Sequence, residues 1–207
     1  SLKEAVLAEP LACGIHATKL IGDLIGSTVA IVGTGIIGLS CLVAAKRAGA
    51  EKILVSGISD DKEEIVKRLG AYYVNSTTTD PIEYLQEINN GKLADVVYEC
   101  IGSGQTLDLA LNMSRIAAKI MVMGVFENPP KFNMNLFQEG ERTLLSSQAY
   151  VDEMGIILDL MKEKTLPLME LITAEIQLDN IVEDGFEELI RNGGKHIKAI
   201  IKIAELE

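Results

Sequence analysis

A glycine-rich turn that directly follows a buried strand constrains the fold of this chain more than any other feature. The apolar run Val29–Val32 predicts a fully buried strand, and Gly33, Gly35 and Gly38 follow it at the spacing G-x-G-x-x-G. The first glycine allows a tight turn, the second lets the backbone approach a pyrophosphate, and the third lets the next helix pack against the strand. The alternative, a turn that merely tolerates glycine, accounts less well for all three positions in this context.

Short apolar runs and helical stretches alternate after this turn. Strands are predicted at the runs Ile53–Val55, Tyr72–Val74, Asp95–Tyr98 and Lys119–Met123. Helices are predicted between strands, at residues 36–48, 60–69, 82–88 and 106–115. Because strand–helix–strand repeats form right-handed crossovers, this order predicts an α/β fold, a doubly wound parallel sheet of the Rossmann type with helices on both faces.

The alternation divides the chain into three predicted parts, residues 1–23, 24–150 and 151–207. The first part is predicted to hold one helix that begins after Pro10. A lone strand is expected at 142–147, near the end of the second part. The third part is predicted to hold helices at 152–162 and 179–191 and a last strand at 196–203.

Charge and composition exclude several classes of protein. Thirty acidic and 19 basic residues give a net charge of −11, which argues against nucleic acid as a partner. A hydrophobic content of 48% argues against disorder, and no apolar run is long enough to span a membrane. Cys13, Cys41 and Cys100 lack the spacing of a disulfide framework or zinc site, which favours the reducing cytoplasm.

The end of the second strand bears on which dinucleotide would bind. A site for NAD usually has an acidic residue about 20 residues after the last glycine, where it binds the ribose hydroxyls. Gly57 lies 19 residues after Gly38, and Ser56, Gly57 and Ser59 leave room and donors for a 2′-phosphate, with Lys62 as its cation. This pattern favours NADP over NAD. The alternative is that the serines only cap the next helix and that Asp60 is the displaced acid.

Short motifs along nearly the whole chain form a consistent set. They are Glu9-Pro10-Leu11-Ala12, the glycine turn, Tyr98-Glu99-Cys100-Ile101-Gly102, Val122-Met123-Gly124 and Phe186-Glu187-Glu188-Leu189. Together they resemble the cofactor-binding portion of the zinc-type medium-chain alcohol and polyol dehydrogenases, near the sorbitol and threonine dehydrogenase branch. In that family, residues 1–23 would correspond to a helix that leads from the catalytic domain, and 151–207 would return toward it.

The resemblance implies a set of cofactor-binding residues. Those at the glycine turn are Gly33, Gly35, Ile36, Ile37 and Gly38, and those on the adenosine side are Lys62, Cys100, Ile101 and Gly102, in addition to Ser56, Gly57 and Ser59 from the spacing described above. Those toward the nicotinamide are Gly124, Val125, Phe126, Ser147, Gln148 and Ala149. The chain departs from the family at Gly57, which replaces the usual acid, and at Ser146, which replaces a common glycine.

Glu9 is the single candidate metal ligand in this sequence. In the family, the carboxylate at this position approaches the catalytic zinc, while an acid that favours the start of a helix explains it equally well. Three protein ligands are needed for a catalytic zinc, and the family draws them from an N-terminal domain that this sequence does not contain. We therefore expect that this chain binds NAD(P) but does not transfer hydride by itself. In the full-length enzyme, zinc is expected to activate an alcohol substrate.

Two other interpretations compete with this one, a methyltransferase-type domain and a non-enzymatic module. A methyltransferase-type domain would need an acid at the end of the second strand and a looser glycine turn, and neither is present. A non-enzymatic dinucleotide-sensing or assembly module is the other, because Thr143–Ser147 could form an edge strand that pairs with a second copy. The family forms dimers in this way, so a homodimer or homotetramer is expected under either interpretation.

Overall fold

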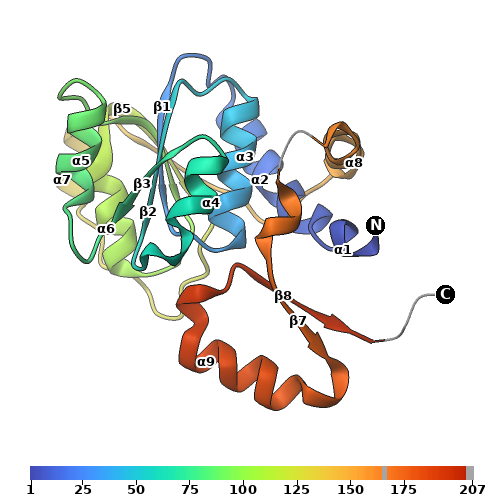
Figure 1. The fold of residues 1–207 in the computed structure, drawn as a ribbon. Helices are drawn as coiled ribbons and strands as arrows, with labels where there is room; N and C mark the ends of the chain where they lie inside the picture. Colours follow the sequence, from blue (N-terminus) through green and yellow to red (C-terminus); the bar gives the residue numbers. More distant parts are fainter. Residues whose placement is uncertain (165–166, 204–207) are drawn as a thin grey trace.

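The computed structural model describes residues 1–164 and 167–203, and a six-stranded parallel sheet forms its centre (Figure 1). The strands are β1 (Thr28–Val32), β2 (Lys52–Gly57), β3 (Tyr72–Asn75), β4 (Ala94–Glu99), β5 (Ser114–Val122) and β6 (Thr143–Ser146). Their order is β3-β2-β1-β4-β5-β6, the order of a dinucleotide-binding sheet, with the reversal between β1 and β4. The expected Rossmann fold is confirmed.

Helices cover both faces of the sheet (Figure 1). One face carries α2 (Ala8–Ile21), α3 (Ile36–Arg47) and α4 (Glu63–Arg68), and the other carries α5 (Pro81–Ile88), α6 (Gly104–Met113) and α7 (Met134–Glu139). Strand β1 is buried on both sides, since Val29 and Ile31 join the first core and Ala30 and Val32 join the second. This two-sided burial explains its unbroken apolar sequence.

Helix α2 packs so closely on α3 that only glycine fits at the crossing. A Cβ atom on Gly14 would lie 2.5 Å from the backbone carbonyl carbon and oxygen of Ser40 in α3. Helix α8 (Met154–Glu163) packs in turn against α2. A short helix, α1 (Leu2–Ala5), precedes α2, which begins at Ala8, so the expectation of one helix starting after Pro10 was wrong. Proline is accepted there because the first turn of a helix needs no amide donor.

A smaller parallel pair of strands, β7 (Ile172–Gln177) and β8 (Lys198–Lys202), lies beside the main sheet (Figure 1). The chain between them was expected to be one amphipathic helix over 179–191. It instead forms a 3₁₀ turn, a π-helix (Ile181–Glu187) and α9 (Glu188–Asn192). The buried Gly185 lies within the π-helix, where a Cβ would make ordinary contacts with Ile181 and Ile176 at 3.5 and 3.6 Å.

One further boundary, one strand pairing and two elements differ from expectation. The helix expected at 106–115 is α6, which ends at Met113, because β5 begins at Ser114 and contains a register shift near its start. The strand expected to be alone at 142–147 is β6, which pairs in parallel with β5. Strand β7 and helix α7 had not been anticipated. The three-part division of the chain stays a prediction.

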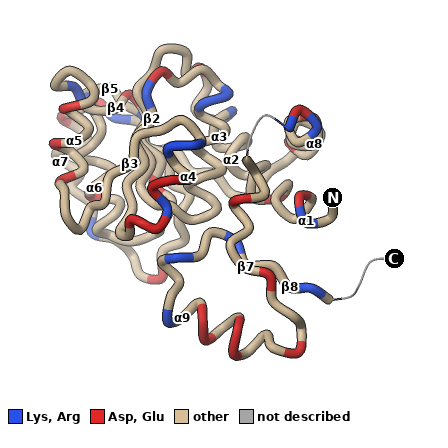
Figure 2. Tube along the Cα trace, viewed as in Figure 1, with Lys and Arg blue, Asp and Glu red and all other residues tan. Residues whose placement is uncertain are grey.

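Charged residues are distributed over the whole described chain (Figure 2). Some helices carry both signs of charge, as in the ion pairs Lys67–Glu63 on α4 and Arg191–Glu187 at α9. Within residues 1–164 and 167–203, no helix combines the length and the apolar character needed to cross a membrane.

Candidate functional site

The turn between β1 and α3 leaves an open, uncapped helix start. Gly33 has φ +118°, and a Cβ there would lie 2.9 Å from the Ile101 Cγ1 atom. A Cβ on Gly38 would lie 2.0 Å from the carbonyl oxygen of Gly33, so α3 touches the strand end there. Gly35 begins α3 without a side-chain cap and has no atom within 4 Å of its Cβ position. Amides at such a helix start suit an anion.

The end of β4 lies beside this turn, where the strand order reverses. The Cys100 amide donates to the Val32 carbonyl oxygen at 3.0 Å, and the Cys100 Cβ atom would lie 3.5 Å from a Cβ on Gly33. Ligands of doubly wound sheets bind at this reversal, in the crevice beyond the carboxyl ends of the strands. The structure thus brings together Gly33, Cys100 and Ile101, three residues that the sequence assigned to the site.

A buried carboxylate, Glu99, fixes the backbone of this second loop. Its Oε1 atom accepts hydrogen bonds from the amides of Ile101 (2.9 Å) and Gly102 (2.8 Å) and from the Thr106 hydroxyl (2.8 Å). The side chain is fully buried, and Oε2 has no hydrogen-bond partner among the described residues. The sequence placed Glu99 in a motif without a role, although a charged residue at the end of an apolar strand was a signal for one.

The loop after β5 packs directly on that loop. Gly102 has φ +92°, and a Cβ on it would lie 2.3 Å from the carbonyl oxygen of Val125. A Cβ on Gly124 would lie 2.1 Å from the Gly102 amide nitrogen and 2.6 Å from the Glu99 Oε2 atom. Val125 is exposed at this edge and Phe126 is half-buried. The predicted residues Gly102, Gly124 and Val125 therefore form one contact.

The loop after β6 completes the same edge. The Ser147 amide donates to the Val122 carbonyl oxygen at 3.2 Å, which places the start of the loop beside the end of β5. The Ser147 hydroxyl oxygen is buried and has no partner among the described residues. Gln148 is exposed, and Ala149 adopts the left-handed conformation with φ +52°.

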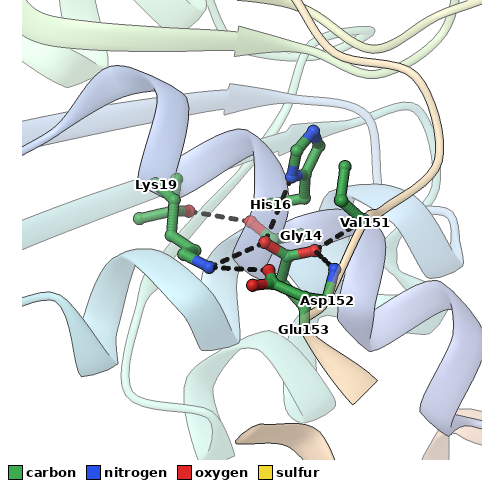
Figure 3. A network of polar contacts seen from close by, with 7 residues as sticks. Gly14, His16, Lys19, Val151, Asp152 and Glu153 are labelled. Atoms are coloured by element: carbon green, nitrogen blue, oxygen red, sulfur yellow. Dashed lines mark hydrogen bonds and ion pairs between the residues drawn. The ribbon is translucent and has the colours of Figure 1, made fainter. Parts of the chain in front are cut away.

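Glu153 joins the end of this loop to α2 (Figure 3). Its carboxylate is buried and accepts hydrogen bonds from Lys19, His16 and the amides of Val151 and Asp152. Burial alone would raise the pKa of Glu153, but hydrogen bonds from Lys19, Val151, His16 and Asp152 outweigh it and lower that pKa far below its usual range. The carboxylate is therefore ionised at neutral pH.

The end of β2 is more crowded than the sequence suggested. A Cβ on Gly57 would lie 2.6 Å from the Tyr73 hydroxyl and 2.8 Å from the Thr34 Cγ2 atom, so the room expected at Gly57 is taken. Ser56 is buried, and its carbonyl oxygen accepts from the Gly33 amide at 2.9 Å. The Ser59 hydroxyl is also engaged, because it donates to the Asp61 carboxylate at 2.6 Å. Little space adjoins Gly57 itself, and the binding of a 2′-phosphate by these residues stays a prediction.

Lys62 remains as the cation on this side. It ends a 3₁₀ turn (Asp60–Lys62) that lies against a second 3₁₀ turn (Gly193–Lys195) before β8, and only 6% of its surface is exposed. Among the described residues its ammonium has neither an ion pair nor a hydrogen bond. Burial lowers the pKa of Lys62, and the nearby Asp61 opposes the shift.

Glu9 lies in the first turn of α2, with its side chain exposed. Its Oε1 atom accepts a hydrogen bond from the Cys13 thiol at 3.4 Å, and burial, then the Glu9 charge, raises the pKa of Cys13 to about 12. Within the part of the chain that the structure describes, no three His, Cys, Asp or Glu residues are grouped as a metal site requires. These residues alone do not fit a catalytic zinc.

Comparison with known proteins agrees with this geometry. Residues 37–163 match a family model described as zinc-binding dehydrogenase. Sorbitol dehydrogenase of Bacillus subtilis is 27% identical over 97% of this chain. The crystal structure of 2R,3R-butanediol dehydrogenase from Bacillus subtilis has a TM-score of 0.88 and 29% identity over 99% of this chain and 58% of that protein.

A third protein was solved with a dinucleotide. This zinc-binding dehydrogenase of Sinorhizobium meliloti, bound to NADP, has a TM-score of 0.83 and 25% identity over 96% of this chain and 58% of its own. The chain spans about 57% of the length of the curated relatives it matches. The family resemblance noted from the sequence is confirmed.

Proposed function

Because this chain belongs to the zinc-binding dehydrogenase family, we propose that it is the nicotinamide-dinucleotide-binding portion of an alcohol or polyol dehydrogenase. The start of α3 carries this proposal. Gly35 leaves an open approach to amides that no side chain caps, which suits a pyrophosphate. A bound nicotinamide would exchange hydride with an alcohol, a chemistry that belongs to the cofactor.

The two halves of the sheet would receive the two halves of the dinucleotide. The amides of Ile36 and Ile37 and the contacts around Gly33 and Gly38 would hold the pyrophosphate at the β1–β4 reversal. The first half of the sheet, ending in β2 and β3, would bind the adenosine. The loops after β5 and β6, at 124–126 and 147–149, would then face the nicotinamide. Cys100, Ile101 and Gly102 would lie between the two halves.

Zinc would need ligands from beyond the described residues, because Glu9 is not part of any group of three metal-binding side chains among them. We propose that Glu9 approaches such a zinc in the whole dehydrogenase, and that this chain by itself binds the dinucleotide without transferring hydride. We further propose a cytoplasmic homodimer or homotetramer, since the edge strand β6 is largely exposed and free to pair with a second copy.

Titration with NADPH, NADH and S-adenosylmethionine tests the proposal. We expect the nicotinamide fluorescence of both dinucleotides to change on binding, and calorimetry to detect heat. S-adenosylmethionine is expected to give no heat of binding. Binding of S-adenosylmethionine alone would instead support a methyltransferase-type site. Dimerisation with no affinity for any of the three would support an assembly module.

We propose that the site prefers NADP, and Lys62 supports this preference. The Lys62 side chain is largely buried, its ammonium has no ion pair among the described residues, and a 2′-phosphate would provide an anion for it. No carboxylate stands at position 57 to repel that phosphate. The packing of Tyr73 and Thr34 around Gly57 is itself sufficient reason for glycine there, so Lys62 carries the argument.

Lys62→Glu is expected to weaken NADPH binding by at least about tenfold and to change NADH binding little, because a carboxylate would repel the 2′-phosphate at close range. The matched control is Lys67→Glu, the same charge change at an exposed residue of α4. Dissociation constants from fluorescence titration measure both. Equal loss of NADPH and NADH affinity in Lys62→Glu would contradict the assignment.

A further inference from the structure

The carboxylate of Glu153 divides its two oxygens between two elements of the fold (Figure 3). Its Oε2 atom accepts from the amides of Val151 (2.8 Å) and Asp152 (3.1 Å), both in the loop between β6 and α8. Its Oε1 atom accepts from Lys19 Nζ (2.9 Å) and from His16 Nδ1 (3.2 Å), both in α2. Glu153 is therefore a bridge between the loop and the helix.

The loop has few other attachments. Ser147 anchors its start to β5, and Asp152 makes an exposed contact to Lys19 at 3.2 Å. Gln148, Ala149 and Tyr150 form no hydrogen bond with any described residue, although Tyr150 packs against the core. Without Glu153, the segment between Ser147 and α8 would be held mainly by that packing.

Helix α2 gives the bridge a rigid base. Its crossing with α3 admits no side chain at Gly14, so the two helices cannot slide without separating. The same α3 carries the open helix start at Gly35. Glu153 thus ties the loop after β6 to the helix layer that presents the pyrophosphate amides.

We propose that Glu153 is a positioning residue that holds Gln148 and Ala149 at the nicotinamide end of the site, an inference that rests on the proposed dinucleotide-binding function. Residues 147–149 lie at the carboxyl edge of the second half of the sheet, which receives the nicotinamide half of a dinucleotide. Moving them would change the contacts of the nicotinamide ring and leave those of the adenosine in place.

A glutamine at position 153 distinguishes the effect of the hydrogen-bonded bridge from the effect of simple packing. Its volume matches that of Glu153, but its amide has one acceptor oxygen, which can face the loop or α2 and not both. Its NH₂ group would then point at other donors. Glu153→Gln therefore breaks one side of the bridge while it preserves the shape of the buried site.

The test compares NADPH with 2′-phospho-ADP-ribose, which lacks the nicotinamide. Glu153→Gln is expected to weaken NADPH binding about tenfold and to leave binding of 2′-phospho-ADP-ribose within about twofold. Hydrogen exchange of the backbone amides of 148–152 is expected to accelerate. Asp152→Asn removes the negative charge from the other, exposed contact to Lys19. It is the matched control, and both affinities and the exchange rates are expected to stay unchanged.

A second variant, Lys19→Met, removes a half-exposed ammonium from the buried Glu153 carboxylate and leaves the two loop amides on that carboxylate. Circular dichroism first establishes that this variant folds, because a buried carboxylate that loses its cation is destabilising. Lys19→Met is expected to shift NADPH affinity in the same direction by a smaller factor. Unchanged NADPH affinity in Glu153→Gln, or equal loss of both ligands, would overturn the inference while leaving dinucleotide binding intact. A wild-type chain that binds neither ligand would overturn the proposed function itself, and the inference with it.

Discussion

Gly38→Ala is expected to lower the free energy of unfolding by about 3 kcal/mol, the upper end of the range for overpacked sites. The new methyl group would lie 2.0 Å from the carbonyl oxygen of Gly33, which is backbone and cannot move aside alone. Helix α3 would have to shift away from the end of β1, and the pyrophosphate crevice would change with it. Chemical denaturation followed by circular dichroism measures the loss.

Gly35→Ala is the matched control for this variant. Its methyl group would meet no atom within 4 Å, and its φ of −73° suits alanine. We expect its free energy of unfolding to change by less than about 1 kcal/mol, the scale of a weaker helix cap. Its methyl group would nevertheless obstruct a pyrophosphate. Equal stability of the two variants would show that α3 does not contact the strand end as described.

Glu99→Ala is expected to destabilise the chain by about 3 kcal/mol or more, because two amides and one hydroxyl lose their acceptor in a buried place. The loop at Ile101 and Gly102 would also lose its fixed shape, and dinucleotide affinity should fall. Glu99→Gln keeps an oxygen for the same donors and should cost less.

Thermal and denaturant unfolding of the two Glu99 variants, each with a dinucleotide titration, provides the measurement. A Glu99→Ala chain as stable as wild type would mean that the Ile101 and Gly102 amides find other acceptors. Equal destabilisation in Glu99→Gln would indicate that the charge of the carboxylate, rather than its acceptor oxygen, holds the loop.

Local sequence patterns identified the sheet and the glycine turn correctly, because residues that are neighbours in the sequence determine both features. A strand buried on both faces requires a continuous apolar run, and the roles of Gly33 and Gly38 follow from the turn and the helix that adjoin it. The pairing of β6 with β5 was missed, since four residues of half-exposed strand show no partner in their own sequence. The π-helix around Gly185 was missed as well, because the sequence pattern over 179–191 is that of an ordinary amphipathic helix.

The adenosine side of the site depended on residues from different elements, which limited prediction from sequence. Tyr73, on the neighbouring strand β3, fills the space beside Gly57, and no spacing within β2 could reveal it. The role of Lys62 as the cation for a 2′-phosphate stays a prediction, and its burial against the turn before β8 was not foreseen. Glu153 was overlooked because two of its donors, His16 and Lys19, lie more than 130 residues away, on α2.

Amide chemical shifts test the central claim most directly. In the ¹⁵N-labelled chain, titration with NADPH should move the backbone amide resonances of Gly35, Ile36 and Ile37 and saturate them at one dissociation constant. The matching titration of Gly35→Ala should show much weaker saturation. NADPH that binds the wild type while these three resonances stay in place would contradict the assignment of the α3 start as the pyrophosphate site.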